Sequence, residues 1–246
     1  MLTENRKIVA VNKPEGDGAE VNRLFPTGHF SHLDPFVLMD EFMVEAPSQF
    51  DEHEHRGFEA ITYMLSGSFV HEDNLGNKSK VEAGGLQHFN AGRSIRHSEA
   101  PGEEEGHSHG IQLWINLPRD KKDSEPVYHK LPAEEIPVQD DGELSVRTVA
   151  GPGSRLPLQT EIIFQDVSMT ENTSYNVQLD SDSQAVIYML EGELEVEDEK
   201  LTPAQGYLLA SGARLSLISL SQKARFIFLS GSPLGQDINI RGSFVE

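Results

Sequence analysis

The sequence has no cysteine and only half as many basic as acidic side chains. Without thiols the chain can form no disulfide, no cysteine-ligated zinc or iron–sulfur site and no thiol nucleophile. The 20 lysines and arginines against 40 aspartates and glutamates give a formal charge of −20. Because nucleic-acid binding relies on Lys and Arg to neutralise phosphates, and anionic lipid repels such a chain, we expect no direct nucleic-acid partner and no membrane partner.

Long apolar runs are also missing. No segment approaches the roughly 20 apolar residues that span a bilayer, and the N-terminal stretch MLTENRKIVAVNKPEGDG lacks the apolar core of a signal peptide. A cytoplasmic location is therefore expected. A serine nucleophile elbow, a P-loop and a dinucleotide-binding glycine pattern are absent as well.

Short β patterns dominate what is present. Residues 58–65, FEAITYML, are predicted to form a strand that ends in a turn at Ser66-Gly67. Similar runs recur along the chain: GIQLWINL, LSVRTVAG, AVIYML, GELEVE and ARFIFLSG. Short strands separated by Gly, Asn, Asp and Pro predict an all-β sandwich or barrel of antiparallel strands. Residues 33–43, LDPFVLMDEFM, are expected to be a turn of helix or an irregular loop.

The chain contains a weak internal repeat. Residues 61–73, ITYMLSGSFVHED, share the frame Tyr-Met-Leu-x-Gly and a closing Glu-Asp with residues 186–198, VIYMLEGELEVED. Small-residue turns follow both copies, Asn90-Ala91-Gly92 and Ala210-Ser211-Gly212. Chance similarity between two strand–turn–strand units is the alternative, but repeated units favour two copies of one β fold.

A polar stretch with turn formers, PAEEIPVQDDGE, lies between the two copies. We therefore expect an N-terminal domain at residues 1–135 and a C-terminal domain at residues 136–246.

Two pairs of side chains have the spacing of metal ligands. In DEHEHRGFE, His53 and His55 are two residues apart and would share one face of a strand. In AGRSIRHSE, His97 and Glu99 have the same spacing. Strand–turn–strand patterns between the pairs can bring them together on facing strands. Three imidazoles and one carboxylate suit a redox-active first-row metal better than a structural zinc, and an octahedral ion would keep two open positions.

These stretches resemble the pirin family. HEHRGFEAITYML and AGRSIRHSEAP resemble its two metal motifs, VNRLFPTGHFSHLDPFVLMDEF its N-terminal segment, HGIQLWINLP a core strand and GSPLGQDINIRGSFVE its C-terminal tail. The resemblance covers nearly the whole chain and implies a bicupin of two antiparallel jelly-roll barrels. It also implies one divalent metal, iron first and Mn, Ni, Co, Cu or Zn as alternatives, held by His53, His55, His97 and Glu99.

The chain departs from the family pattern at two positions. Where the family reads PGDLQWMTAG, this chain reads AGGLQHFNAG, with Gly85 in place of Asp and His88 in place of Trp. The departures put pocket shape and substrate preference in question rather than metal binding.

Other candidate side chains are assigned structural roles. Glu59 lies where many cupins have a glutamate ligand, but we expect a supporting carboxylate there. His71, His88 and the pair His107 and His109 are expected to be structural or exposed rather than ligands, and so are His29, His32 and His129. Phe58 and Phe89 are expected as aromatic neighbours of the site, with plain core packing as the alternative.

The resemblance implies quercetin 2,3-dioxygenase activity on a planar flavonol and dioxygen, with Glu99 as the catalytic base for the substrate hydroxyl. One alternative is a non-catalytic redox sensor or transcriptional co-regulator that acts through a protein partner. A metal-binding stress protein without turnover is another.

The second repeat is predicted to lack the site. Aligning the two copies places Gln178, Asp180, Leu217 and Ser219 where the first copy has its ligands. One metal per chain is therefore expected.

Overall fold

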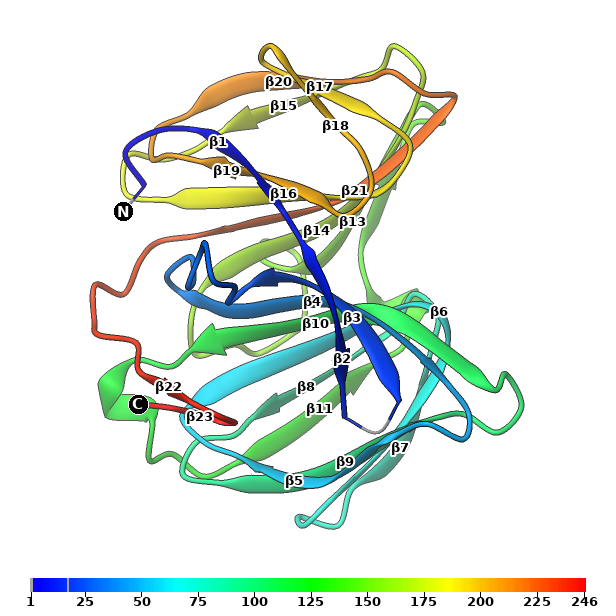
Figure 1. Ribbon diagram of the computed structural model, residues 1–246, viewed down its shortest axis with the longest axis vertical. Helices are drawn as coiled ribbons and strands as arrows, with labels where there is room; N and C mark the ends of the chain where they lie inside the picture. Colours follow the sequence, from blue (N-terminus) through cyan, green and yellow to red (C-terminus); the bar gives the residue numbers. More distant parts are fainter. Residues whose placement is uncertain (1, 17) are drawn as a thin grey trace. The chain divides into compact units, whose positions relative to one another are not determined.

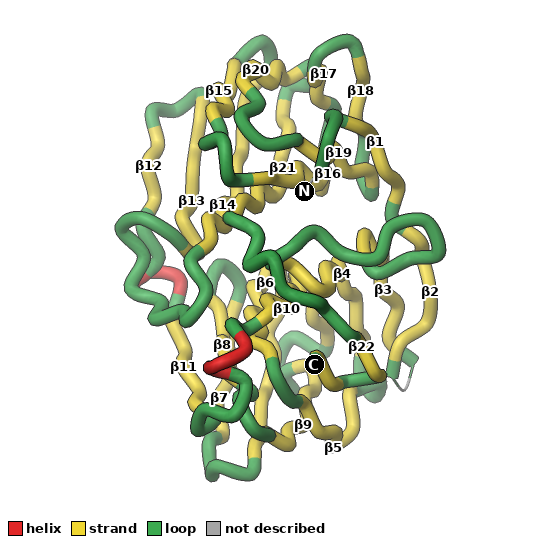
Figure 2. The backbone as a smooth tube through the Cα atoms, turned by 90° about the vertical axis from the view of Figure 1, so that its left-hand side faces the viewer, coloured by secondary structure: helices red, strands yellow, loops and turns green. Residues whose placement is uncertain are grey.

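The structure is a computed structural model that describes residues 2–16 and 18–246. In this part of the chain, strands make up nearly all regular structure, and the helical segments are two single 3-10 turns, η1 (Arg119–Lys121) and η2 (Ala133–Glu135) (Figures 1 and 2). The predicted all-β class is thereby confirmed. None of the described helical segments is long and apolar enough to cross a membrane.

The chain divides into two compact units that interleave in sequence. The N-terminal unit comprises Val11–Glu135, Leu156–Thr160 and Leu234–Glu246, and the C-terminal unit comprises the chain up to Ala10, Ile136–Arg155 and Glu161–Pro233. The predicted domain boundary between residues 135 and 136 stays a prediction.

The strands of the N-terminal unit are β2 (Val11–Glu15), β3 (Ala19–Phe25), β4 (Phe36–Glu45), β5 (Phe50–His55), β6 (Phe58–Asp73), β7 (Lys78–Glu82), β8 (Leu86–Asn90), β9 (Ile95–Pro101), β10 (His107–Asn116), β11 (Val127–Leu131), β22 (Ile240–Arg241) and β23 (Phe244–Val245).

Strand β6 organises the N-terminal unit. Its first half pairs with β8 and β10, and its second half pairs with β7 and β9. The main sheet has the order β11-β8-β6-β10-β4-β3-β2, and β9 connects β6 to β5. All these pairings are antiparallel, and the shared strand β6 curls the sheet around an interior (Figure 1).

The turn predicted at Ser66-Gly67 is wrong, because β6 continues through it. The pairing with β10 shifts register between His109 and Gly110, so that Leu65 is skipped and a bulge results. Gly67 has a φ of 68°, and a Cβ there would lie 2.1 Å from the carbonyl oxygen of His107. Glycine is therefore required here because the backbone of β10 passes close to it beside a β-bulge, and not because the chain turns.

The expectation of a turn of helix or an irregular loop at residues 33–43 is also wrong. Most of this stretch belongs to β4, whose first seven residues are all buried. A strand that is buried on both faces has a continuous run of apolar residues. The spacing of apolar residues alone cannot distinguish such a run from a buried helix.

The C-terminal unit is a second set of curled antiparallel strands with an apolar interior. A seven-stranded sheet has the order β1-β19-β16-β21-β14-β13-β12, and a four-stranded sheet has the order β15-β20-β17-β18. Its core contains Phe226, Tyr207 and Leu217 among sixteen buried apolar side chains. The strands of this unit are β1 (Arg6–Val9), β12 (Val138–Asp140), β13 (Leu144–Ala150), β14 (Ile162–Thr170), β15 (Ser174–Gln178), β16 (Gln184–Glu191), β17 (Leu194–Val196), β18 (Glu199–Leu201), β19 (Gln205–Leu209), β20 (Arg214–Ser219) and β21 (Lys223–Gly231).

Candidate metal centre

The candidate centre lies where β5, β9 and β6 pair side by side. His53 of β5 is directly opposite His97 of β9, and Glu99 of β9 is directly opposite His71 of β6. Alternate residues of a strand share a face, so His55 follows His53 and Glu99 follows His97. The two spacings found in the sequence thus become neighbouring side chains.

Three imidazoles form the first part of the centre. One ring nitrogen from each of His53, His55 and His97 lies within 4.8 Å of the other two, and the Nε2 atoms of His53 and His97 are 3.1 Å apart. His55 and His97 are 3% and 1% exposed. Three convergent imidazoles are a suitable donor set for a first-row metal ion.

Backbone carbonyls orient two of the rings. The Nδ1 of His53 lies 2.7 Å from the carbonyl oxygen of Asp51, and the Nδ1 of His55 lies 3.4 Å from that of Ser243 in the C-terminal tail. A carbonyl only accepts, so each Nδ1–H is the donor and each Nε2 keeps its lone pair. Such hydrogen bonds fix the tautomer and orientation of metal-binding histidines.

The electrostatics keep the buried rings neutral. Burial, and then the neighbouring His53, lower the pKa of His55 to about 3. Burial, and then the other three histidines, hold the pKa of His97 well below its usual range. Both imidazoles are therefore unprotonated at neutral pH, which is the form that binds a metal ion.

Glu99 belongs to a second, overlapping group with His71 and His97. Its Oε1 is 3.8 Å from the Nδ1 of His97 and 3.9 Å from the Nδ1 of His71, and it accepts a hydrogen bond from the Nε2 of Gln87. Glu99 also lines the same cavity as His53 and His55. The structure therefore brings the four predicted ligands into one region but divides them between two groups that share His97.

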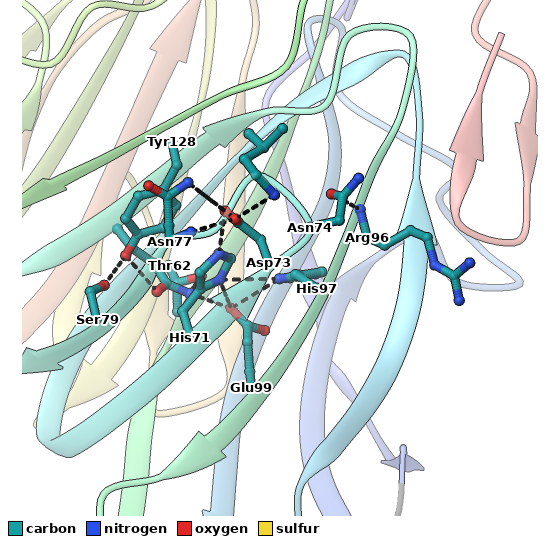
Figure 3. A network of polar contacts seen from close by, with 12 residues as sticks. Thr62, His71, Asp73, Asn74, Asn77, Ser79, Arg96, His97, Glu99 and Tyr128 are labelled. Atoms are coloured by element: carbon teal, nitrogen blue, oxygen red, sulfur yellow. Dashed lines mark hydrogen bonds and ion pairs between the residues drawn. The ribbon is translucent and has the colours of Figure 1, made fainter.

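His71 is the residue that sequence reasoning missed. Its side chain is fully buried, and its Nε2 lies 3.0 Å from the Oδ2 of Asp73 (Figure 3). Burial alone lowers the pKa of His71, but the hydrogen bonds and charges of Glu99 and Asp73 outweigh it, so the pKa is raised. The signal in the sequence was the spacing of His71 and Asp73 on one strand face.

A cavity of about 780 Å³ opens beside the candidate centre, which is within the roughly 300–1,000 Å³ of small-molecule sites. Trp114 lines it and packs edge-on against His55, with ring centroids 5.1 Å apart. The other apolar lining residues are Val21, Pro26, Val37, Leu38, Phe42, Phe50, Phe69 and Ile240. The charged and polar ones, besides the candidate ligands, are Glu15, Arg23, Asp40, Asp51, Glu52, Gln112 and Ser243.

The predicted aromatic neighbours lie behind the ligands rather than in the cavity wall. Phe89 stacks on His55 with ring centroids 5.5 Å apart, and Phe58 stacks on Trp114 at 4.2 Å. Both are fully buried, and neither is among the lining residues. Gly85 and His88, the two departures from the family pattern, do not line the cavity either.

Glu59 is not part of the candidate metal-binding groups and makes other contacts. Its carboxylate is fully buried and accepts hydrogen bonds from the backbone N–H groups of Gln159 and Thr160 and from His88 Nε2 at 3.2 Å. It therefore anchors residues 156–160 to the N-terminal unit. His109 contacts Glu41 and His107 contacts the backbone of Glu105, so neither joins the candidate centre.

Two curled antiparallel sheet units, one with convergent buried histidines, define a cupin-type protein with two such folds. A family model described as Pirin matches residues 18–115, and one described as Pirin C-terminal cupin domain matches residues 164–246. A Pirin-like protein of Solanum lycopersicum is 36% identical over 98% of this chain and 85% of its own length. The chain belongs to the pirin family.

Solved structures show the same fold. A quercetin 2,3-dioxygenase from Acinetobacter baumannii is 25% identical with a TM-score of 0.89, covering 98% of this chain and 90% of its own. The bacterial pirin YhhW from Escherichia coli, solved in complex with nickel(II), is 20% identical with a TM-score of 0.79, covering 94% of this chain and all of its own.

Proposed function

We propose that this chain is a metal-dependent dioxygenase that opens the ring of a small planar aromatic substrate, a flavonol such as quercetin. The observation that carries the proposal is the position of His53, His55 and Glu99 in the wall of an aromatic-lined cavity. The fold shared with a quercetin 2,3-dioxygenase at 25% identity supports it. The donor set supports one divalent ion, Fe(II) in the first place, bound by His53, His55, His97 and Glu99.

When bound, the ion supplies Lewis acidity and activation of dioxygen. The protein's own contribution begins with substrate orientation. Trp114 and Phe50 present aromatic surface to the cavity, so a flat ring can pack against them while its hydroxyl faces the imidazoles. The apolar wall also excludes water from the reacting ring.

Glu99 is the proposed acceptor of the substrate hydroxyl proton. Gln87 donates to one carboxylate oxygen and thereby fixes the side chain, and the carboxylate lines the cavity beside His53 and His55. A base must reach within hydrogen-bond distance of the proton it takes, and Glu99 is the one carboxylate among the proposed ligands.

The test is aerobic turnover of quercetin by protein loaded with Fe(II), Mn(II), Ni(II) or Co(II), followed by flavonol absorbance and oxygen uptake. We expect slow, metal-dependent loss of absorbance that a chelator abolishes. Glu99→Gln protein that retains metal should lose at least about 100-fold in kcat, the usual contribution of a positioned base, while flavonol binding changes little. The matched control is Glu54→Gln, the same change at an exposed side chain of β5 that does not line the cavity.

A fully metallated wild type that consumes neither quercetin nor oxygen would contradict the proposal. That result would favour the non-catalytic alternative, a metal-binding redox sensor that acts through a protein partner. Pull-down with the iron in each oxidation state would then be the informative measurement.

A further inference from the structure

A buried histidine–aspartate pair lies behind the three imidazoles. His71 and Asp73 project from the same face of β6, and in the pairing with β9 they stand opposite Glu99 and His97. Both side chains are 0% exposed, and neither lines the cavity. The pair contacts the proposed metal ligands (Figure 3) but lies outside the lining of the cavity in which substrate is proposed to bind.

Asp73 is fixed as a hydrogen-bond acceptor by the turn that follows it. Its Oδ1 accepts from the backbone N–H groups of Leu75 and Asn77, each at 3.0 Å, and its Oδ2 accepts from Asn77 Nδ2 at 2.9 Å. Burial raises the pKa of Asp73, but the hydrogen bonds from Asn77 and His71 outweigh it and the pKa is lowered. The carboxylate is therefore ionised at neutral pH.

The order of hydrogen bonds determines where the protons of the two rings lie. His71 Nε2–H donates to Asp73 Oδ2 at 3.0 Å. The charge of a cation bound at His97 would favour the neutral form of His71, and a neutral His71 with this hydrogen bond has its lone pair on Nδ1. That atom is 3.3 Å from the Nδ1 of His97. Two facing lone pairs would repel, so His97 Nδ1–H is the donor and His97 Nε2 keeps its lone pair.

The lone pair on His97 Nε2 is directed toward the other proposed histidine ligands. His97 Nε2 faces the Nε2 of His53 at 3.1 Å, on the opposite side of the ring from His71. Neither of these Nε2 atoms carries a proton in this arrangement, so a cation bound by both nitrogens is what would offset the repulsion of their lone pairs. His53 and His55 obtain the same tautomer from backbone carbonyls, whereas His97 depends on His71.

We propose that Asp73 and His71 form a hydrogen-bond relay that fixes the tautomer and the orientation of His97, which makes His71 a positioning residue of the metal centre. The proposal rests on the metal centre of the proposed function. Partners of this kind change metal affinity by roughly 10–100-fold when they are removed.

A second set of contacts holds the relay in place. Tyr128 stacks on His71 with ring centroids 4.4 Å apart and an interplanar angle of 21°. The Tyr128 hydroxyl pairs with Ser79 and also donates to Gln87 Oε1 at 3.4 Å, which leaves the Gln87 Nε2 to donate to Thr62 and Glu99. Rotation of His71 would break its stacking on Tyr128 and its ring-nitrogen contacts with Asp73 and His97.

The experiment measures Co(II) and Ni(II) affinity and the visible spectrum of the Co(II) protein, using the full chain. We expect His71→Leu to weaken both affinities by about 10–100-fold and to change the Co(II) bands. His71→Asn, whose carbonyl oxygen can accept from His97, should recover part of the loss. The matched control is His109→Leu, because His109 pairs with Glu41 away from the cavity.

Asp73→Asn tests the relay without changing the size of any buried side chain. An amide N–H facing His71 Nε2 would move the His71 proton to Nδ1 and reverse the donor order. Affinity should fall as in His71→Leu, and the double variant should lose no more than either single one, because interacting residues are not additive.

The outcomes separate the relay from the proposed function. Wild-type protein that binds neither Co(II) nor Ni(II) would overturn the metal centre and the relay together. Wild-type binding that Asp73→Asn and His71→Leu leave unchanged in affinity and spectrum would overturn the relay alone. Misfolding of His71→Leu would leave the Asp73→Asn result as the decisive one.

Discussion

At the scale of residues, His97 is the side chain that joins the two halves of the candidate centre. Its Nε2 faces His53 and its Nδ1 faces His71 and Glu99. Two-residue spacing on strands was enough to predict that each proposed ligand pair shares a face, and the pairing of β5 with β9 brings the pairs together. The role of His71 was not predictable in this way, since it depends on the pairing of β6 with β9 and on Asp73 being buried.

The first prediction concerns His97 itself. His97→Ala should remove at least about nine-tenths of the bound metal, because it deletes the ligand shared by both groups and ligand atoms provide the binding free energy. Elemental analysis of protein purified with Ni(II) measures this, and the far-UV spectrum should remain that of a β protein. His109→Ala, the matched control, should retain wild-type metal. Equal metal in the two variants would show that the ligand assignment is wrong.

At the scale of elements, sequence patterns gave the wrong structure for two strands. One is buried on both faces, and the other pairs with two different sets of strands along its length. β4 looked like a helix or loop because its first seven residues are buried without alternation. β6 looked like two strands because Gly67 resembles a turn residue, yet it is one strand. Its residues up to Gly67 pair with β8 and β10, and its residues from Ser68 onward pair with β7 and β9. Because β6 is one continuous strand, its last residues, including His71 and Asp73, pair with β9.

The bulge leads to the second prediction. Gly67→Ala should destabilise the protein by more than the roughly 1–2 kcal/mol of a left-handed non-glycine residue, because its Cβ would lie 2.1 Å from the carbonyl oxygen of His107. Gly76→Ala is the matched control, since Gly76 also has a positive φ but a Cβ there would meet nothing within 4 Å. Urea unfolding compares the two. A loss for Gly67→Ala no larger than for Gly76→Ala would contradict the close approach.

At the scale of the whole molecule, the chain has two copies of one fold, and the candidate metal-binding groups found among the described residues all lie in the N-terminal unit. All ten histidines lie between His29 and His129, so the C-terminal unit has none in the part that the structure describes. In the alignment of the two halves, the positions of the proposed ligands correspond to Gln178 and Asp180, which are both exposed, and to Leu217, which belongs to the apolar core. Composition and the repeat therefore predict one metal site per chain, since imidazole is the donor on which the proposed site depends.

The last prediction is that each chain binds one metal ion, although ligand atoms form two groups. Both groups use His97, so two ions would need that ring to lose both protons and bridge them. In the inner group, His71 already donates a hydrogen bond from its Nε2 to Asp73. Elemental analysis should give about one metal per chain, and His53→Ala combined with His55→Ala should reduce it to near zero. Retention of a full equivalent in that double variant would place the ion in the inner group, and two equivalents in the wild type would show that both groups bind.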